Sequence, residues 1–214
     1  MLDEAAVRCA TLERLSRSWP SDDHTMIVEE FGTHFGDNRI DVAVVNGALR
    51  GYEIKSTRDR LTRLPDQVTA FSEVFDYATV VVAERHLDAA MGLIPDWWGV
   101  IEARDARGGT GLTERRRGRR NQTLVPVAVA RLLWRDELLI ALEAIGADVG
   151  IRSRGRPELA SRLAESLPLD ELRCVVRHTI RARQSWRVDP ERTPSAGRSP
   201  LVRTSSGFLA RRLR

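Results

Sequence analysis

A single lysine, Lys55, stands in a chain whose other 33 basic residues are all arginine. It closes the triplet Glu53-Ile54-Lys55, and Asp41 lies upstream in the strand-like run 40–45. Lysine and arginine are not interchangeable where a compact ammonium must sit beside a water and a phosphate. An acid followed by an acid–x–lysine on the next strand therefore indicates metal-dependent phosphodiester chemistry. The alternative is that Lys55 is a remnant of an arginine-rich composition.

Two carboxylates that share a site with water and phosphate oxygens suit Mg²⁺ or Mn²⁺, which are hard cations. Such an ion would lower the pKa of a bound water and stabilise charge growing on the phosphorus. Lys55 would orient or deprotonate that water, or stabilise the transition state electrostatically. The sequence has no GxxxxGK loop and no GxSxG motif, which argues against nucleotide hydrolysis and against an esterase.

The acids and the lysine can meet only if the two strands pair in the right register. Side chains alternate along a strand, so Glu53 and Lys55 share one face. A two-residue turn at Asn46-Gly47 would place Asp41 opposite Tyr52, on the wrong face, whereas a three-residue loop places it opposite Glu53. We therefore expect an odd loop or a compensating bulge. The apolar face would then hold Ile40, Val42, Val44, Tyr52 and Ile54.

Hydrophobic periodicity outlines the remaining elements. It predicts helices over 2–18, 65–75, 86–93, 126–147 and 157–183, and strands over 26–31, 40–45, 49–56, 78–83 and about 99–101. An Arg- and Gly-rich break separates the strands from the later helices. We expect an α/β core over 1–103, a loop or linker over 104–122, a helical region over 123–186 and a disordered basic tail over 187–214.

Charge is distributed unevenly along the 214 residues. Residues 1–100 carry a net charge of −7 and residues 101–214 a net charge of +11, which favours an acidic chemical centre beside a polyanion-binding surface. A solvated arginine-rich tail with no partner is the alternative. No apolar run approaches the roughly 18 residues of a membrane helix, and the acidic N-terminus is unlike a signal peptide, so we expect a cytoplasmic protein. Cys9, Cys174 and the four histidines show no metal-ligand spacing.

The chain resembles the PD-(D/E)xK nuclease superfamily, in a branch of small bacterial proteins. The residues that carry this resemblance are Glu30, Arg39-Ile40-Asp41, Glu53-Ile54-Lys55-Ser56, Asp59-Arg60-Leu61-Thr62-Arg63-Leu64 and Gln67. The resemblance covers about residues 25–102 and implies a restriction-endonuclease-like αβββαβ core with a mixed sheet flanked by helices. It departs from the superfamily at Ile40, where a proline is usual, and at Phe71, where some members have tyrosine.

The resemblance also implies roles for individual residues. Asp41, Glu53 and the Ile54 carbonyl would bind Mg²⁺ or Mn²⁺. Lys55 would be the catalytic lysine, and Glu30 an outer acid. Gln67 would complete the catalytic set, unless it is a helix-surface amide. Arg63 would lie beside the site with Asp59 unless the two form only a local ion pair, and Arg39 would contact nucleic acid.

The basic half supplies further candidates for contact with nucleic acid. These are Arg115, Arg116, Arg117, Arg119, Arg120, Arg152, Arg154 and Arg156. The helix–loop–helix around 132–163 resembles a SAP-type DNA-binding hairpin, although a plain helical cap explains it equally well. Such arginines give salt-dependent affinity without base readout.

The sequence thus predicts a metal-dependent DNA nuclease, most naturally an endonuclease. The alternatives are a non-catalytic DNA-binding protein with the same fold and an RNA nuclease. DNA is the expected partner, RNA a second option, no membrane is expected, and a homodimer is allowed.

Overall fold

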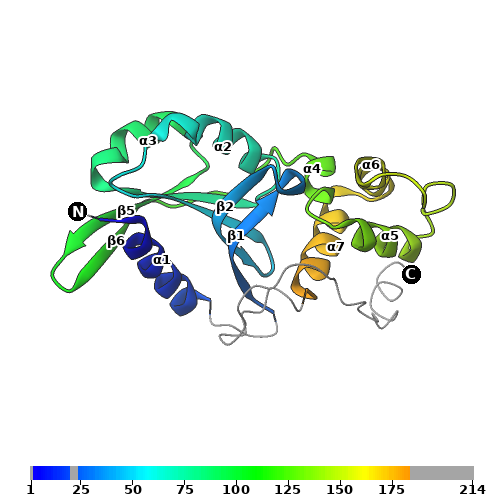
Figure 1. Ribbon diagram of the computed structural model, residues 1–214, viewed down its shortest axis with the longest axis horizontal. Coiled ribbons are helices and arrows are strands. Elements are labelled where there is room, and N and C mark those ends of the chain that lie inside the picture. The colour runs from blue at the N-terminus through cyan, green and yellow to red at the C-terminus, as the bar shows by residue number, and fades with distance from the viewer. Residues whose placement is uncertain (1, 20–23, 184–214) are drawn as a thin grey trace.

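The computed structural model of the chain describes residues 2–19 and 24–183 (Figure 1). Its centre is a six-stranded sheet in the order β1-β2-β3-β4-β5-β6. The strands are β1 (Met26–Thr33), β2 (Asn38–Val45), β3 (Leu49–Lys55), β4 (Tyr77–Ala83), β5 (Gly99–Ala106) and β6 (Gly109–Arg116). The helices are α1 (Glu4–Ser18), α2 (Leu64–Ser72), α3 (Leu87–Leu93), α4 (Pro126–Ala130), α5 (Arg135–Ala144), α6 (Arg156–Ser166) and α7 (Leu169–Arg181). Short 3-10 turns are η1 (His34–Gly36), η2 (Leu61–Arg63) and η3 (Glu84–His86).

The sheet is mixed, as predicted. Strands β1, β2 and β3 pair antiparallel, β3, β4 and β5 pair parallel, and β6 returns antiparallel along β5. Parallel neighbours need a crossover, and α2 and α3 supply the two that are required. The order α1-β1-β2-β3-α2-β4 is the expected αβββαβ succession, and the fold is α/β with a C-terminal helical region.

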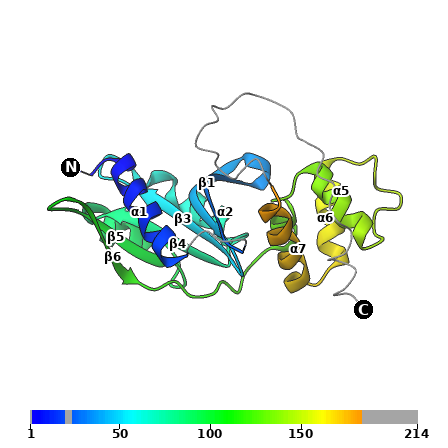
Figure 2. The same ribbon diagram turned by 90° about the horizontal axis from the view of Figure 1, so that it is seen from below.

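The sheet is covered on both faces, and Figures 1 and 2 show α2 and α3 on one side and α1 on the other. The larger core joins the α2 side to the C-terminal helices and includes Phe71, Phe75 and Val80. The smaller core lies under α1 and includes Val7 and Leu15. Burial on both faces explains the continuous apolar run 78–83, which forms the central strand β4.

Helices α4 to α7 gather at one end of the molecule, beside β1 and β2 (Figure 1). A buried ion pair between Arg173 of α7 and Asp76 fastens this region to the core, and Asp76 also accepts a hydrogen bond of 2.7 Å from the Leu49 amide. Within residues 2–19 and 24–183, no helix combines the length and the apolar character needed to span a bilayer.

The structure corrects the predicted bounds of three segments. The expected loop or linker 104–122 contains the end of β5 and the whole of β6, because Gly108 and Gly109, both at positive φ, turn the chain back into the sheet. The expected helix 126–147 is two helices, α4 and α5, and the expected helix 157–183 is broken at Leu167-Pro168 into α6 and α7. The expected disordered tail 187–214 lies outside the described residues, and the domain boundaries stay predictions.

Candidate functional site

The register that would align Asp41 with Glu53 is present. Strands β2 and β3 pair Val45 with Leu49 and Val42 with Tyr52, so three residues form the loop. Within it, the Asn46 amide donates to the Ala48 carbonyl and the Ala48 amide donates to Asn46 Oδ1, each at 3.0 Å. The same register carried one step further puts Asp41 opposite Glu53, which confirms the prediction of an odd loop.

The predicted apolar face is wrong at one position. Val42, Val44, Tyr52 and Ile54 belong to the core under α1, but Ile40 belongs to the opposite core. The ladder between β2 and β3 ends at Val42, so the chain before it turns away from β3. Beyond this point the Ile54 amide donates to Asp41 Oδ2 at 2.6 Å. This local divergence swings Ile40 to the other side of the sheet.

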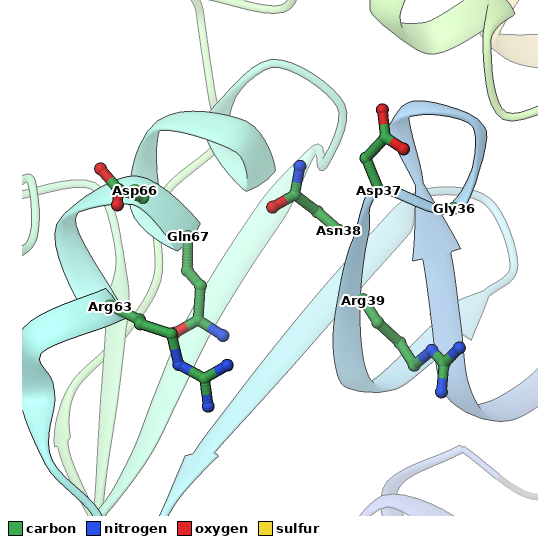
Figure 3. Close-up of a pocket in the computed structure, with 7 residues that line it drawn as sticks. All are labelled: Gly36, Asp37, Asn38, Arg39, Arg63, Asp66 and Gln67. Carbon is green, nitrogen blue, oxygen red and sulfur yellow. The ribbon is translucent and has the colours of Figure 1, made fainter.

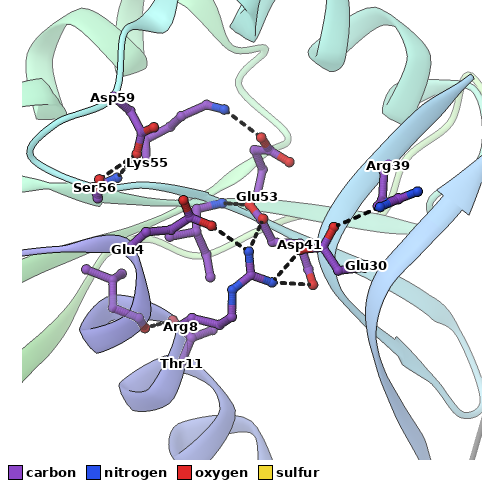
Figure 4. Close-up of polar contacts among 12 residues, drawn as sticks. Glu4, Arg8, Thr11, Glu30, Arg39, Asp41, Glu53, Lys55, Ser56 and Asp59 are labelled. Atoms are coloured by element: carbon purple, nitrogen blue, oxygen red, sulfur yellow. Dashed lines mark hydrogen bonds and ion pairs between the residues drawn. The ribbon is translucent and has the colours of Figure 1, made fainter. Parts of the chain in front are cut away.

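Glu53 and Lys55 form a buried pair at the carboxyl end of β3. Lys55 Nζ and Gln67 Nε2 both donate to Glu53 Oε1 at 2.6 Å (Figure 4 shows the lysine contact). The side chains of Glu53 and Lys55 are only 3% and 9% exposed. Burial raises the pKa of Glu53 to about 7 despite the attraction of Lys55, and the nearby charge of Asp41 adds to the rise.

Two buried oxygens at this place have no hydrogen-bond partner within the described part of the chain. They are Glu53 Oε2 and Gln67 Oε1. Leaving such atoms unsatisfied is costly, so a water or an ion is the natural partner for them. Either oxygen can accept a hydrogen bond from water or ligate a cation.

Asp41 is engaged on both of its oxygens. Oδ2 accepts from the Ile54 amide, and Oδ1 lies 2.6 Å from Arg8 Nη2 of α1 (Figure 4). Burial raises the pKa of Asp41, against the opposing effects of the Ile54 amide, Arg8 and Lys55. Glu30, the expected outer acid, lies 2.9 Å from Arg8 and 3.6 Å from Arg39. Its backbone is left-handed, with φ of 52°, in a β-strand.

Sequence reasoning missed Arg8. Its spacing of four from Glu4 signals a local helical ion pair, which is present at 2.7 Å. Nothing in the sequence signals that the same guanidinium reaches Asp41 and Glu30 on two strands.

A pocket of about 480 Å³ opens next to the Glu53–Gln67 contact. It is lined by Gly36, Asp37, Asn38, Arg39, Arg63, Asp66 and Gln67. Figure 3 shows the residues of α2 and its leading turn on one side and those of β2 and the preceding turn on the other. Arg63 and Gln67 lie close together in this view. Asp59 does not pair with Arg63; it accepts hydrogen bonds from the amide and the hydroxyl of Ser56, both at 2.6 Å.

The donor set fits a hard cation in part. No group of three or more His, Cys, Asp or Glu side chains in residues 2–19 and 24–183 could enclose an ion. Glu53 Oε2 and Gln67 Oε1 are nevertheless oxygen donors of the type that Mg²⁺ accepts, and Mg²⁺ commonly keeps several waters. Asp41 could join them only by exchanging Arg8 for the ion. Ile54 itself packs its side chain into the core under α1 and donates its amide to Asp41.

Of the arginines predicted to contact nucleic acid, only Arg39 and Arg63 line this pocket. Arg115 is held by Glu102 at 2.5 and 2.9 Å, and Arg116 donates to the Trp98 carbonyl at 2.8 Å. The chain after them follows the amino ends of β4 and β5, because the Arg119 amide donates to the Trp97 carbonyl.

The amino ends of β4 and β5 lie at the opposite end of the strands from Lys55, which pairs with Val82 near the carboxyl end of β4. Arg117 and Arg119 are exposed there, and Arg120 lies 3.7 Å from Asp170. The arginines at 115–120 therefore lie apart from Arg39 and Arg63, which line the pocket.

The loop between α5 and α6 uses most of its arginines internally. Arg152 bonds to Asp148 at 2.5 Å and to Glu143 at 3.0 Å. Arg156 stacks on Phe35, with 4.1 Å between Cζ and the ring centroid, and donates to the Leu133 carbonyl. Arg154 is exposed.

The fold and the site define an α/β protein in which a buried acid–lysine pair lies beside an arginine-lined pocket. The model of the family described as Bacteriophage P4 protein cII matches residues 1–189, and the chain belongs to this family. Protein cII of Enterobacteria phage P4 is 27% identical over 183 residues, which are 86% of this chain and 68% of the relative. The solved SPO1766 protein of unknown function from Silicibacter pomeroyi aligns at 19% identity and a TM-score of 0.40, covering 70% of this chain and 92% of the other.

Membership of this family corrects the sequence-based assignment. The chain is not a member of the PD-(D/E)xK superfamily, and the predictions of a metal-dependent DNA nuclease and of an RNA nuclease are wrong. Asp41 is held by Arg8 and the Ile54 amide, and one oxygen of Glu53 is held by Lys55 and Gln67. The expectations of a divalent cation and of nucleic acid as partner do not depend on that assignment, since they follow from the donor atoms and the charge.

Proposed function

We propose that this protein binds nucleic acid, with DNA as its main partner, by seating a backbone phosphate in the pocket between Arg39 and Arg63. A Mg²⁺ or Mn²⁺ ion bound by Glu53 would bridge the protein to that phosphate. The observation that carries the proposal is that two exposed arginines line a pocket together with Gln67, which contacts Glu53, and that Gln67 and Glu53 each have a buried oxygen without a partner.

The mouth of the pocket suits an anion. Arg63 is exposed and has no ion pair or side-chain hydrogen bond within the described residues, and Arg39 holds only a 3.6 Å contact to Glu30. Arg58 and Arg60 are also exposed on the loop that leads to Arg63. A planar guanidinium matches the oxygens of a phosphate, and several in one loop attract a polyanion over a distance.

The inner part of the pocket suits a cation. Glu53 Oε2 and Gln67 Oε1 would supply two oxygen ligands, and water and phosphate oxygens would fill the remaining positions. The ion would offset the charge of Glu53 when that group ionises and would hold the phosphate close to Lys55. Nucleic acid is a natural partner because its phosphates combine with cations and arginines at once.

The pocket is a better candidate than the C-terminal helices. Arg152 and Arg156, which were expected to contact DNA, are committed to internal contacts. A cytoplasmic location is part of the proposal, and the free thiols of Cys9 and Cys174 support it.

The test is a titration of labelled duplex DNA, single-stranded DNA and RNA, followed by fluorescence anisotropy at several salt concentrations. The variant Arg39→Ala/Arg63→Ala should weaken binding and reduce the slope of log K against log salt by about 2, since each lost phosphate contact accounts for about 0.9. Addition of Mn²⁺ in place of EDTA should tighten binding by the wild type more than by Glu53→Gln.

The matched control is Arg117→Ala/Arg119→Ala, which removes the same charge from two exposed arginines on the other edge of the sheet. Equal losses in the two double variants would indicate nonspecific attraction and not a pocket. A loss confined to the control would place the nucleic acid on the opposite edge. Tighter binding of RNA than of DNA would change the partner but keep the site.

A further inference from the structure

The acidic cluster around Asp41 already contains a cation of the protein's own. The guanidinium of Arg8 lies 2.7 Å from Glu4 Oε1, 2.9 Å from Glu30 Oε1 and 2.6 Å from Asp41 Oδ1 (Figure 4). A further nitrogen contact, of 3.2 Å, reaches the Asp41 carbonyl. One side chain of α1 therefore gathers three carboxylates from a helix and two strands.

A divalent cation that binds Asp41 would have to displace Arg8 from that carboxylate. Arg8 occupies Oδ1 of Asp41, and the register of β2 and β3 places Asp41 one step beyond the pair Val42–Tyr52, on the side of Glu53. Glu53 contributes the orphaned Oε2, from a side chain that is 97% buried. A divalent ion bound to both carboxylates would lie close to the Arg8 guanidinium. The two positive charges of the ion and the one of Arg8 would then repel each other.

Arg8 can give up Asp41 without losing its other partners. Glu4 lies one turn away on the same helix, and Glu4 and Glu30 are both about half exposed, so the guanidinium can stay between them. Asp41 for its part keeps the hydrogen bond from the Ile54 amide on Oδ2 while Oδ1 becomes free. The helix itself remains anchored through Val7 and Leu15 in the core. The exchange needs a movement of side chains only.

We propose that Arg8 competes with the divalent cation for Asp41, so that helix α1 sets the affinity of the site. This inference rests on the proposed function and deepens it, because it names the residue that regulates the cation. In the resting state the guanidinium neutralises Asp41. Entry of the ion displaces it toward Glu4 and Glu30.

The experiment is a titration of the full chain with Mn²⁺, with free Mn²⁺ measured by electron paramagnetic resonance. Arg8→Gln should bind Mn²⁺ about tenfold more tightly than the wild type, because one nearby positive charge is removed. Arg14→Gln is the matched control: it lies on the same helix, but its partner Glu114 is 3.9 Å away and belongs to β6. Its affinity for Mn²⁺ should equal that of the wild type.

Circular dichroism establishes whether each variant folds, and Arg8→Lys replaces Arg8→Gln if the latter does not. Lysine keeps the charge but cannot hold three carboxylates, so its affinity should fall between the two. Equal affinity of wild type and Arg8 variant, both lost in Glu53→Gln, would overturn the competition and leave the cation site standing. Absence of binding by wild type and Arg8 variant alike would overturn both the cation site and the competition. A tenfold gain in Arg14→Gln would reduce the effect to general charge and overturn the role of Arg8.

Discussion

Replacement of Glu53 by glutamine should make the protein more stable at pH 7 and above, and should change its stability little below about pH 4.5. Burial raises the pKa of Glu53 from the usual 4.5 to about 7. Between these values the unfolded chain has lost its proton while the folded chain keeps it, so wild-type stability falls as pH rises from about 4.5 to 7. The interval corresponds to about 3 kcal/mol, at 1.36 kcal/mol per pH unit.

The same pH interval sets the expected difference in the free energy of unfolding between the wild type and Glu53→Gln. Below about pH 4.5 Glu53 is protonated in the folded chain and largely protonated in the unfolded chain, and the protonated acid and the amide are nearly isosteric, so the two free energies of unfolding should agree within about 0.5 kcal/mol. At pH 8 the variant should be more stable by up to about 3 kcal/mol. The glutamine also avoids a buried carboxylate, although Lys55 then loses its charged partner.

Urea unfolding at pH 5, 6, 7 and 8 in the presence of EDTA measures this difference. The difference between wild type and variant isolates Glu53, because all the other ionisable groups are common to both proteins. A difference that stays constant from pH 5 to pH 8 would refute the reasoning. So would a variant that is less stable at pH 8, since it would show that the ion pair outweighs the cost of burial.

Three further predictions concern the Asp76–Arg173 ion pair, the packing at Gly51 and the ionisation of Glu53. Asp76→Asn should cost about 3–5 kcal/mol in urea unfolding, because it leaves the buried guanidinium of Arg173 with only the exposed carboxylate of Asp170; a loss below about 1 kcal/mol would contradict this. Gly51→Ala should cost about 1–3 kcal/mol, because the new Cβ would lie 2.5 Å from Ile40 Cδ1, and an unchanged midpoint would count against that packing. Affinity for Mn²⁺ should rise about tenfold from pH 6 to pH 8, since Glu53 must ionise to bind, and a flat pH profile by calorimetry would contradict it.

The sequence predicts the sheet well where alternation and turns decide the structure. Only a three-residue loop keeps Asp41 and Glu53 on one side, and the pairing of Val45 with Leu49 confirms it. The apolar run 78–83 identified the central strand for a similar reason, since burial on both faces removes the need for polar positions.

The site could be predicted only in part, because its partners come from distant elements. No spacing rule brings Arg8 of α1 to Asp41 of β2, and no periodicity reveals where β2 leaves β3 and carries Ile40 across the sheet. The chemistry was misread for the same reason. An acid–x–lysine on a strand is equally compatible with a buried pair closed by Gln67, and the family assignment shows that the nuclease interpretation was wrong.

The most direct test of the proposed cation and phosphate site is a crystal structure of the protein with Mn²⁺ and a short DNA duplex, with data collected for the anomalous signal of manganese. We expect an anomalous peak within coordination distance of Glu53 Oε2, a phosphate between that ion and Arg63, and Arg8 withdrawn from Asp41. Manganese absent from this position, with Lys55 and Gln67 still bound to Glu53 and the DNA on another surface, would contradict the proposal.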